Sequence, residues 1–355
     1  MKLLFALPGF HKYDRGAEVA LLAVADELAA AGEDVTVVGS GQARPGMNYA
    51  FRHVGSIARE RFERFPSLPA LRSETNWEDM TFAANLLRKV DLHEYDATVT
   101  CSFPFTHWAL RRHGKKGPRH FFVTQNGDWP AVSDKSEFRH FDCDGLFCTN
   151  PDYFENNRAR WNCVLVPNGA DLGRFRPAPS TRAEFDLPED KKIVLMVSAM
   201  IETKRVADAV RAMAEVEDVF LVVAGDGPLR GEVEALAKTL LPGRFRRITL
   251  PAAKMPELYN CADVFLHMSL LESFGNVFVE AMATGLPIVG HDTERLRWIV
   301  GDGEFLADTE NRGQLVAQIR SALGAGDRPM NPNLERFSWS AIAETYRQFI
   351  SRTLG

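Results

Sequence analysis

The sequence predicts an α/β protein with two parallel-sheet domains, and three observations lead to this prediction. The chain has 355 residues, which is enough for two separate hydrophobic cores. Residues 2–7 are strand-like, an Ala-rich helix ends near Gly32, and residues 35–38 form the next apolar run. This strand–helix–strand order favours a parallel sheet. A second apolar run at 193–197 begins a new sheet in the second half.

The remaining elements follow from apolar runs bounded by turn residues. In the first half we expect a helix near 79–90, strands at 96–101 and 121–124, and a last strand within 143–150. In the second half we expect strands at 219–224, 247–250 and 262–268 and a helix at 229–240. The tail at 338–354 carries apolar residues on one helical face, which are Ile342, Tyr346, Phe349 and Ile350.

Composition and charge exclude several classes of protein. Hydrophobic residues make up 45% and charged residues 25%, as in ordinary globular domains, and the net charge of −5 argues against a nucleic-acid binder. No apolar run reaches the ~20 residues of a transmembrane helix, and the N-terminus does not have the pattern of a signal peptide. The five scattered cysteines favour reduced thiols in the cytoplasm, and no zinc-ligand spacing follows Cys143 and Cys148.

The most informative stretch is residues 270–287, which lies between two short apolar runs. Asn276 to Thr284 contains helix formers, and Gly285 stands where a C-cap glycine ends a helix. Gly275 lets the backbone approach a ligand closely. The free N–H groups of the first turn, from Phe274 to Val277, therefore form a site for a phosphate.

Two carboxylates flank this expected phosphate site. Glu280 is one helical turn beyond Asn276 and shares its face, and Glu272 lies in the preceding loop. One acid can accept hydrogen bonds from ribose hydroxyls and the other from hexose hydroxyls, which suits a sugar nucleotide. The alternative is a surface acid beside an ordinary capped helix, but the combination of features favours the ligand site.

The same residues resemble a family signature. Glu272 and Glu280 are separated by seven residues, F-G follows the first acid, and E-A-M-A-x-G-x-P begins at the second. This pattern resembles the retaining GT-B glycosyltransferases of family 4, the glycosyl transferases of group 1. Residues 255–264, M-P-E-L-Y-N-C-A-D-V, also resemble that family.

The resemblance implies a donor site that several loops build. Lys204 matches the family's lysine and is expected to bind the diphosphate, with Arg205 as a weaker second cation, whereas Ser198-Ala199 replaces the family's G-R. The glycines of this site have simpler alternatives, which are helix entry and turn chemistry. The residues expected to bind the donor sugar nucleotide are Gly16, Lys204, Arg205, Gly225, Asp226, Gly227, Ser273, Phe274, Gly275, Asn276 and Glu280.

Four residues are expected to take part in the reaction, namely Glu272, Lys204, Asn126 and Asp128. Asn126 stands where much of the family has an active-site His. Asn does not titrate, so it is not a general base, but it can hydrogen-bond the transferred sugar. Asp128 and His107 are the candidates for handling the acceptor proton, although Asp128 also fits a turn after Gly127.

The resemblance further implies an architecture and a reaction. Residues 1–172 would form an acceptor-binding Rossmann-like domain, 173–335 a donor-binding Rossmann-like domain facing it across a deep cleft, and 336–355 a helix crossing back to the first domain. A hexosyl group would pass from a nucleoside diphosphate sugar to an acceptor hydroxyl, with retention at the anomeric carbon, in glycan or polysaccharide biosynthesis. The scheme implies no metal and no cofactor besides the donor.

The acceptor stays open among a sugar, a lipid-linked saccharide and a small molecule. We expect a cytoplasmic protein without a nucleic-acid partner, acting either in solution or peripherally at the inner face of the membrane. The basic segment 111–119 is most simply a solvated loop, and the alternative is a patch for anionic lipid or an anionic acceptor.

Two rival functions remain. Asn126 and the missing Arg are compatible with a protein that binds sugar nucleotides without catalysis. Another GT-B enzyme, such as a sugar-nucleotide epimerase, is the second rival. Analysis of the products formed from the donor without an acceptor separates both rivals from a transferase, because the binding protein leaves the donor intact and the epimerase changes its sugar.

Overall fold

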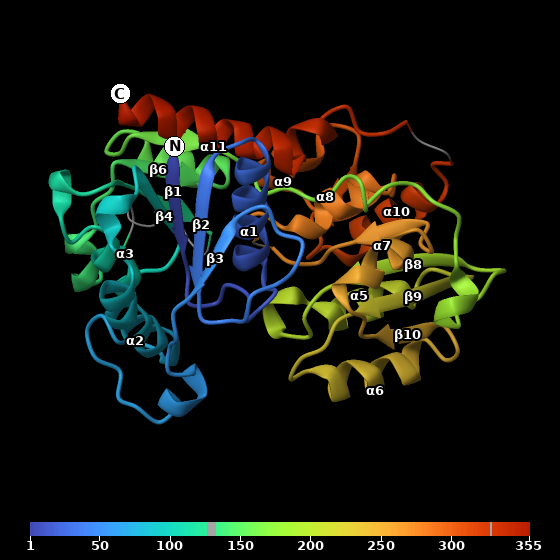
Figure 1. The fold of residues 1–355 in the computed structure, drawn as a ribbon. Helices are drawn as coiled ribbons and strands as arrows, with labels where there is room; N and C mark the ends of the chain where they lie inside the picture. Colours follow the sequence, from blue (N-terminus) through green and yellow to red (C-terminus); the bar gives the residue numbers. More distant parts are fainter. Residues whose placement is uncertain (126–132, 271, 327–328) are drawn as a thin grey trace. The chain divides into compact units, whose positions relative to one another are not determined.

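A computed structural model describes residues 1–125, 133–270, 272–326 and 329–355. The chain folds into two compact units (Figure 1). Unit 1 comprises Met1–Gly169 and Trp339–Gly355, and unit 2 comprises Ala170–Ser338. Within the described part of the chain, no helix combines the length and the apolar character that crossing a membrane requires.

Unit 1 contains a parallel sheet with the strand order β3-β2-β1-β4-β5-β6-β7. Its strands are β1 (Lys2–Ala6), β2 (Asp34–Gly39), β3 (Ala50–His53), β4 (Ala97–Thr100), β5 (Arg119–Thr124), β6 (Gly145–Cys148) and β7 (Cys163–Leu165). Its helices are α1 (Gly16–Ala30), α2 (Glu74–Lys89), α3 (Phe105–Leu110), α4 (Pro151–Asn157) and α11 (Trp339–Leu354).

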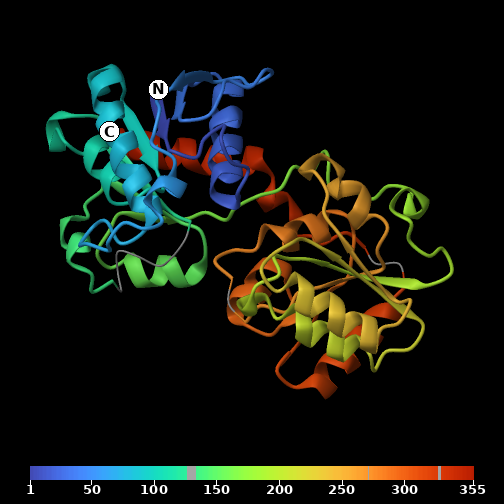
Figure 2. The same ribbon diagram turned by 90° about the horizontal axis from the view of Figure 1, so that it is seen from below.

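Helices cover both faces of this sheet, which explains why β1 is apolar at every position but its first. Side chains alternate between the two faces of a strand. Leu3 and Phe5 therefore join the core beneath α1 and α11, whereas Leu4 and Ala6 join the core beneath α2 and α3. Figures 1 and 2 show α11 running beside α1. The buried face of α11 is the one that its apolar periodicity predicts.

Unit 2 contains a second parallel sheet, ordered β10-β9-β8-β11-β12-β13. Its strands are β8 (Lys192–Val197), β9 (Val219–Ala224), β10 (Phe245–Ile248), β11 (Val264–Leu266), β12 (Ile288–His291) and β13 (Phe305–Ala307). Its helices are α5 (Val206–Met213), α6 (Arg230–Leu240), α7 (Met255–Tyr259), α8 (Asn276–Ala283), α9 (Glu294–Val300) and α10 (Arg312–Leu323).

The same alternation divides the core of unit 2. Leu195 and Phe265 face α7, α8 and α9, whereas Val194 and Val264 face α5, α6 and α10. The central strands β8 and β11 are thus sandwiched between helices, as in other parallel sheets.

Two strand expectations need correction. The last strand of unit 1 is β7 rather than the run at 143–150, which forms β6. The three residues of β7 are too few to give a periodic signal. The strand expected at 247–250 lies two residues earlier, as β10, because Phe245 pairs with Leu221 of β9 and the pairing with β9 ends at Ile248.

Candidate functional site

The strand order of unit 2 brings two loops together. Strand β8 has β9 on one side and β11 on the other, so the connections after β8 and β11 diverge at this point. Open parallel sheets bind ligands outside the carboxyl ends of their strands at such a switch point. The loop after β8 carries Lys204, and the loop after β11 carries Glu272.

Glu272 is the centre of this site. Lys204 Nζ forms an ion pair with Glu272 Oε1, and His267 Nε2 lies 3.1 Å from the same oxygen. His267, which follows β11 directly, is 3% exposed and packs on the ring of Phe278. Burial by itself would raise the pKa of Glu272, but the hydrogen bonds and charges of His267 and Lys204 outweigh it and lower that pKa to about 2. Glu272 is therefore a carboxylate at neutral pH.

Glu280, the second acid, lies on α8 and has its own hydrogen-bond partner. Tyr259 of α7 donates its hydroxyl to Glu280 Oε2 at 2.7 Å. The Tyr259 side chain is fully buried, and this burial raises its pKa well above the usual value, so it remains a donor. Burial also raises the pKa of Glu280, while the Tyr259 hydrogen bond and the charge of Arg174 oppose this rise.

Helix α8 begins as the sequence predicts. Gly275 has φ +84°, and a Cβ there would lie 2.7 Å from the Phe278 ring, so only glycine fits this turn. Phe274 is 2% exposed and packs in the core beside Phe337, so it offers a ligand its backbone alone. The helix supplies no acceptor for the N–H groups of Asn276 and Val277. They lie next to Glu272, in the turn that the sequence predicts to bind an anion, and this binding stays a prediction.

The turn after β9 packs tightly against the loop after β8. Gly225 has φ +154°, and a Cβ on it would lie 2.0 Å from the carbonyl oxygen of Ser198. A Cβ on Gly227 would lie 2.5 Å from the oxygen of Met200, whose N–H donates to the oxygen of Asp226 at 2.9 Å. The two glycines thus let the loops touch, which is a packing reason for the G-D-G-P turn. Their contact with a donor stays a prediction.

Arg205, expected as a weaker second cation for the diphosphate, makes several hydrogen bonds within unit 2. Its guanidinium donates to Thr309 Oγ1 at 3.0 Å and to the Thr309 oxygen at 3.1 Å, and its Nε donates to Asp208 at 3.1 Å. The residue has φ +50° at the entrance to α5. These contacts tie the loop to the segment after β13 and engage all three guanidinium nitrogens. A donor contact for Arg205 remains a prediction.

Of the site residues predicted in unit 1, the structure describes Gly16 but not Asn126 and Asp128. Gly16 begins α1, and a Cβ there would meet no atom within 4 Å, so local packing does not demand a glycine. Asn126 and Asp128 lie outside the described residues. The preceding Gln125 exchanges two amide hydrogen bonds with Asn168, at 2.9 and 3.0 Å, and both side chains are buried.

His107 does not fit the role of an acceptor-proton handler. It lies on α3 with 1% exposure, stacks on Phe141, and shares a 3.0 Å hydrogen bond with His120. Burial first, and the charge of Arg111 second, lower the pKa of His107 to about 3. The imidazole is therefore neutral and internal, because α3 turns it into the core rather than towards solvent.

Sequence reasoning misses the residues that hold the two acids. It places His267 at the end of a strand, and it gives Tyr259, within the matched stretch at 255–264, no role. Arg295 of α9 is a third residue that sequence reasoning misses, since its guanidinium donates to the carbonyl oxygen of Glu272. Only the position of His267 beyond its strand carries a signal, because a polar residue at the carboxyl end of a parallel strand points to a site.

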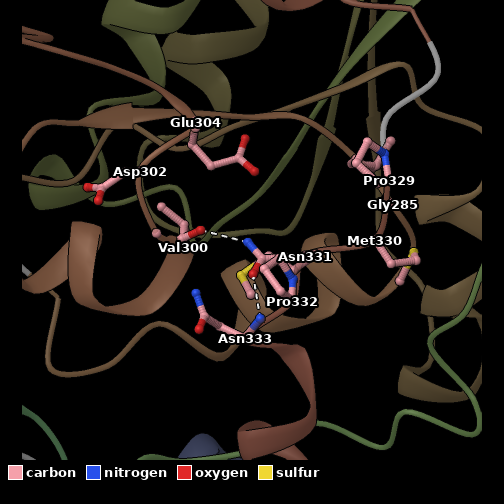
Figure 3. Close-up of a pocket in the computed structure, with 13 residues that line it drawn as sticks. Gly285, Val300, Asp302, Glu304, Pro329, Met330, Asn331, Pro332 and Asn333 are labelled. Carbon is pink, nitrogen blue, oxygen red and sulfur yellow. Dashed lines mark hydrogen bonds between the residues drawn. The ribbon is translucent and has the colours of Figure 1, made fainter.

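A separate pocket lies at the opposite edge of this sheet (Figure 3). It has a volume of about 220 Å³ and is lined by residues at the C-terminal ends of α8 and α9 and by residues 329–333. Asn331 donates to the oxygen of Val300 at 2.6 Å, and Glu304 accepts from the N–H of Ile288 at the start of β12. The pocket is thus at the amino-terminal edge and does not contain Glu272 or Glu280. In the described part of the chain, no group of three or more His, Cys, Asp or Glu side chains is arranged to hold a metal ion.

Comparison with known families agrees with this geometry. Residues 178–335 match the family "Glycosyl transferases group 1", and residues 15–174 match "Glycosyltransferase Family 4". The chain belongs to the group 1 glycosyltransferases. The first match contains both acids and Lys204, and together the two matches extend over most of both units.

Two bacterial relatives share much of the chain. The lipopolysaccharide core biosynthesis glycosyltransferase LpsE of Rhizobium meliloti is 29% identical over 244 residues, which are 65% of this chain and 70% of the relative. LpsD of the same organism is 27% identical over 260 residues, which are 69% of this chain and 74% of the relative. Both relatives are named as glycosyltransferases of lipopolysaccharide core biosynthesis.

Solved structures show the fold. Sucrose-phosphate synthase of Thermosynechococcus elongatus superposes with a TM-score of 0.77 at 21% identity, covering 99% of this chain and 100% of that one. HepE of Anabaena, solved with UDP and glucose, superposes with a TM-score of 0.75 at 17% identity, covering 99% of both chains. The glycosyltransferase has the GT-B fold, with two Rossmann-like domains.

Proposed function

We propose that this glycosyltransferase moves a hexosyl group from a nucleoside diphosphate sugar to an acceptor hydroxyl and retains the configuration of the anomeric carbon. The observation that carries the proposal is the cluster of Lys204, His267 and Glu272 beside the first turn of α8. The structure of HepE was solved with UDP-glucose, which supports a sugar nucleotide as the donor class.

Each group has a role in this reaction. The α8 turn and Lys204 bind the diphosphate and stabilise the charge that develops on it as the glycosidic bond breaks. Glu280 accepts hydrogen bonds from the ribose hydroxyls. Glu272, whose pKa is about 2, stays ionised, so it accepts hydrogen bonds from the hexose and does not protonate the leaving group.

The acceptor hydroxyl attacks from the face that the leaving group occupies, and the departing phosphate takes the proton. This scheme needs no protein base, so it accommodates Asn126 in place of His, with Asn126 hydrogen-bonding the transferred sugar. Asp128 stays the candidate for helping to handle the acceptor proton. No metal and no further cofactor take part in the scheme.

The proposed acceptor is a saccharide or a lipid-linked saccharide at the inner face of the membrane. The two relatives that are named for lipopolysaccharide core biosynthesis support this class. The proposed location is the cytoplasm, because the five cysteines are all free thiols.

The reaction can be tested with water as the simplest acceptor. The full chain is incubated with UDP-, GDP-, ADP- and TDP-hexoses, and NMR follows the released sugar before mutarotation. Release of the nucleoside diphosphate with a sugar of the donor's anomeric configuration supports the proposal. Inversion contradicts retention, epimerised sugar indicates the rival GT-B enzyme, and donor binding without turnover in the presence of saccharide acceptors indicates a binding protein.

A further inference from the structure

The connection between β2 and α2, residues 40–73 with β3 inside it, collects exposed apolar side chains. Among the described residues, seven large apolar side chains are conspicuously exposed, and four of them lie in this connection. These are Met47 (42%), Ile57 (44%), Phe65 (50%) and Leu68 (45%). A concentration of this kind marks an interaction surface, whereas single exposed apolar residues do not.

This connection is anchored in a defined conformation. Arg59 donates to Glu78 Oε2 at 2.7 and 2.9 Å, and Arg72 donates to Glu137 at 2.5 and 2.9 Å. Between these anchors, Phe62 is buried and stacks on Trp77 of α2. Figure 1 shows the segment lying beside α2. Phe65 and Leu68 lie between these anchors, and the N–H of Ile57 donates to Thr81 Oγ1 at 2.9 Å, so these three side chains are presented by an anchored backbone, which lowers the entropy lost on docking.

The same connection is the basic part of an acidic protein. Residues 41–72 contain six Arg and two Glu, a net charge of +4 (6 − 2), whereas the whole chain carries −5. Arg52, Arg61 and Arg64 are exposed, and no carboxylate partner is found for them in the part of the chain that the structure describes. Their charge is available to an anionic partner.

The basic segment 111–119 shares the positive charge but lacks the exposed apolar side chains. Arg112, Lys115 and Lys116 are exposed there without a carboxylate partner among the described residues. Arg111 pairs with Asp142 and with Asp144, and Arg119 pairs with Asp144 at 3.1 Å. Among the described residues, none of the conspicuously exposed large apolar side chains lies in this segment. The patch for anionic lipid, which the sequence analysis gave as an alternative for residues 111–119, therefore fits the β2–α2 connection better.

We propose that the β2–α2 connection docks the enzyme on an anionic lipid surface. Ile57, Phe65 and Leu68 enter the boundary between headgroups and acyl chains, and Arg61 and Arg64 contact lipid phosphates. Apolar side chains next to unpaired arginines match a bilayer, which offers both an apolar layer and negative charge. This inference deepens the membrane-face part of the proposed function and rests on it, but it does not depend on sugar transfer.

The charge contribution can be tested by co-sedimentation of the full chain with vesicles, without any donor. Vesicles of phosphatidylglycerol and phosphatidylcholine in equal parts are compared with vesicles of phosphatidylcholine alone. The variant Arg61→Glu/Arg64→Glu should lose at least about tenfold in binding to the anionic vesicles. The control Lys115→Glu/Lys116→Glu changes the net charge by the same amount and should bind as the wild type does.

The apolar contribution needs a separate pair of variants. Ile57→Ser/Leu68→Ser removes two exposed side chains that belong to no hydrophobic core, so the fold should persist. This variant should bind anionic vesicles about tenfold more weakly, whereas the control Val19→Ser/Met330→Ser should not. Thermal unfolding confirms that each variant is folded.

Three results would overturn the proposal. The first is an equal loss of vesicle binding in the variants and in their controls. The second is equal binding of the wild type to anionic and to neutral vesicles. The third is a folded wild type that binds neither kind of vesicle but forms dimers, which Ile57→Ser/Leu68→Ser dissociates. The last result would assign the surface to a second copy of the chain. A donor-induced thermal shift in the same preparation reports on the donor site independently, so failure of the surface is distinguished from failure of the proposed transferase.

Discussion

Replacing Glu280 with Gln should weaken donor binding and leave the fold intact. The amide keeps the size of the side chain, and its oxygen can still accept the hydrogen bond that Tyr259 donates at 2.7 Å. We therefore expect the free energy of unfolding to change by less than about 1 kcal/mol. Truncation to Ala would instead leave the buried Tyr259 hydroxyl without its acceptor, so Gln is the cleaner change.

The effect on the donor follows from the negative charge that Glu280→Gln removes. A hydrogen bond to a charged group contributes about 1.5–3 kcal/mol, and a neutral one about 0.5–1.5 kcal/mol. The difference, about 1–1.5 kcal/mol, corresponds to roughly tenfold weaker binding of the nucleoside diphosphate. Isothermal titration calorimetry at neutral pH measures it directly.

Two controls make this experiment decisive. Glu257→Gln removes the same charge from a half-buried position on the neighbouring α7 and should leave the affinity unchanged. Tyr259→Phe leaves the partly buried Glu280 carboxylate without its donor, so it should cost about 1–3 kcal/mol of unfolding free energy and raise the pKa of Glu280 further. Unchanged nucleotide affinity in a folded Glu280→Gln protein would refute the assignment of this acid to the ribose.

The remaining predictions concern Lys204, the buried His107 and two glycines of unit 2. Lys204→Gln should lower the turnover of the donor by about 10²–10³-fold, and an unchanged rate would remove this lysine from the reaction. The pKa of His107 is lower in the fold (about 3) than in the unfolded chain (6.5), so acid favours unfolding. Between pH 8 and pH 5 this group should cost ~2 kcal/mol of stability in urea titrations, a loss that should disappear in His107→Gln. Gly225→Ala should destabilise by ~1–3 kcal/mol because its Cβ meets Ser198, whereas Gly231→Ala on α6, where a Cβ meets nothing within 4 Å, should stabilise by ~0.5–1 kcal/mol. Equal melting temperatures for the two alanine variants would contradict the close approach of the loops.

The sequence could predict the parts of the site that depend on local structure. Gly275, the start of α8 and the placement of Glu272 before it follow from helix entry rules and from the apolar runs on either side. The buried face of α11 follows from its periodicity in the same way.

The contacts that organise the site depend on strand order, which short-range patterns do not contain. Lys204 reaches Glu272 across 68 positions of the chain because β8 and β11 are neighbours in the sheet. Arg205 reaches Thr309 across 104 positions. The prediction for His107 fails for a related reason, since its burial is decided by the packing of α3 on the sheet and not by its own neighbours in sequence.

The central claim is that unit 2 binds a nucleoside diphosphate sugar through Lys204, Glu272, Glu280 and the first turn of α8. A thermal-shift screen of the full chain against UDP-, GDP-, ADP- and TDP-sugars tests it most directly, because a ligand that binds only the folded protein raises its melting temperature. We predict a rise with the sugars of one base, which Glu280→Gln reduces. No rise with any of the four, for a protein that is folded, would contradict the claim.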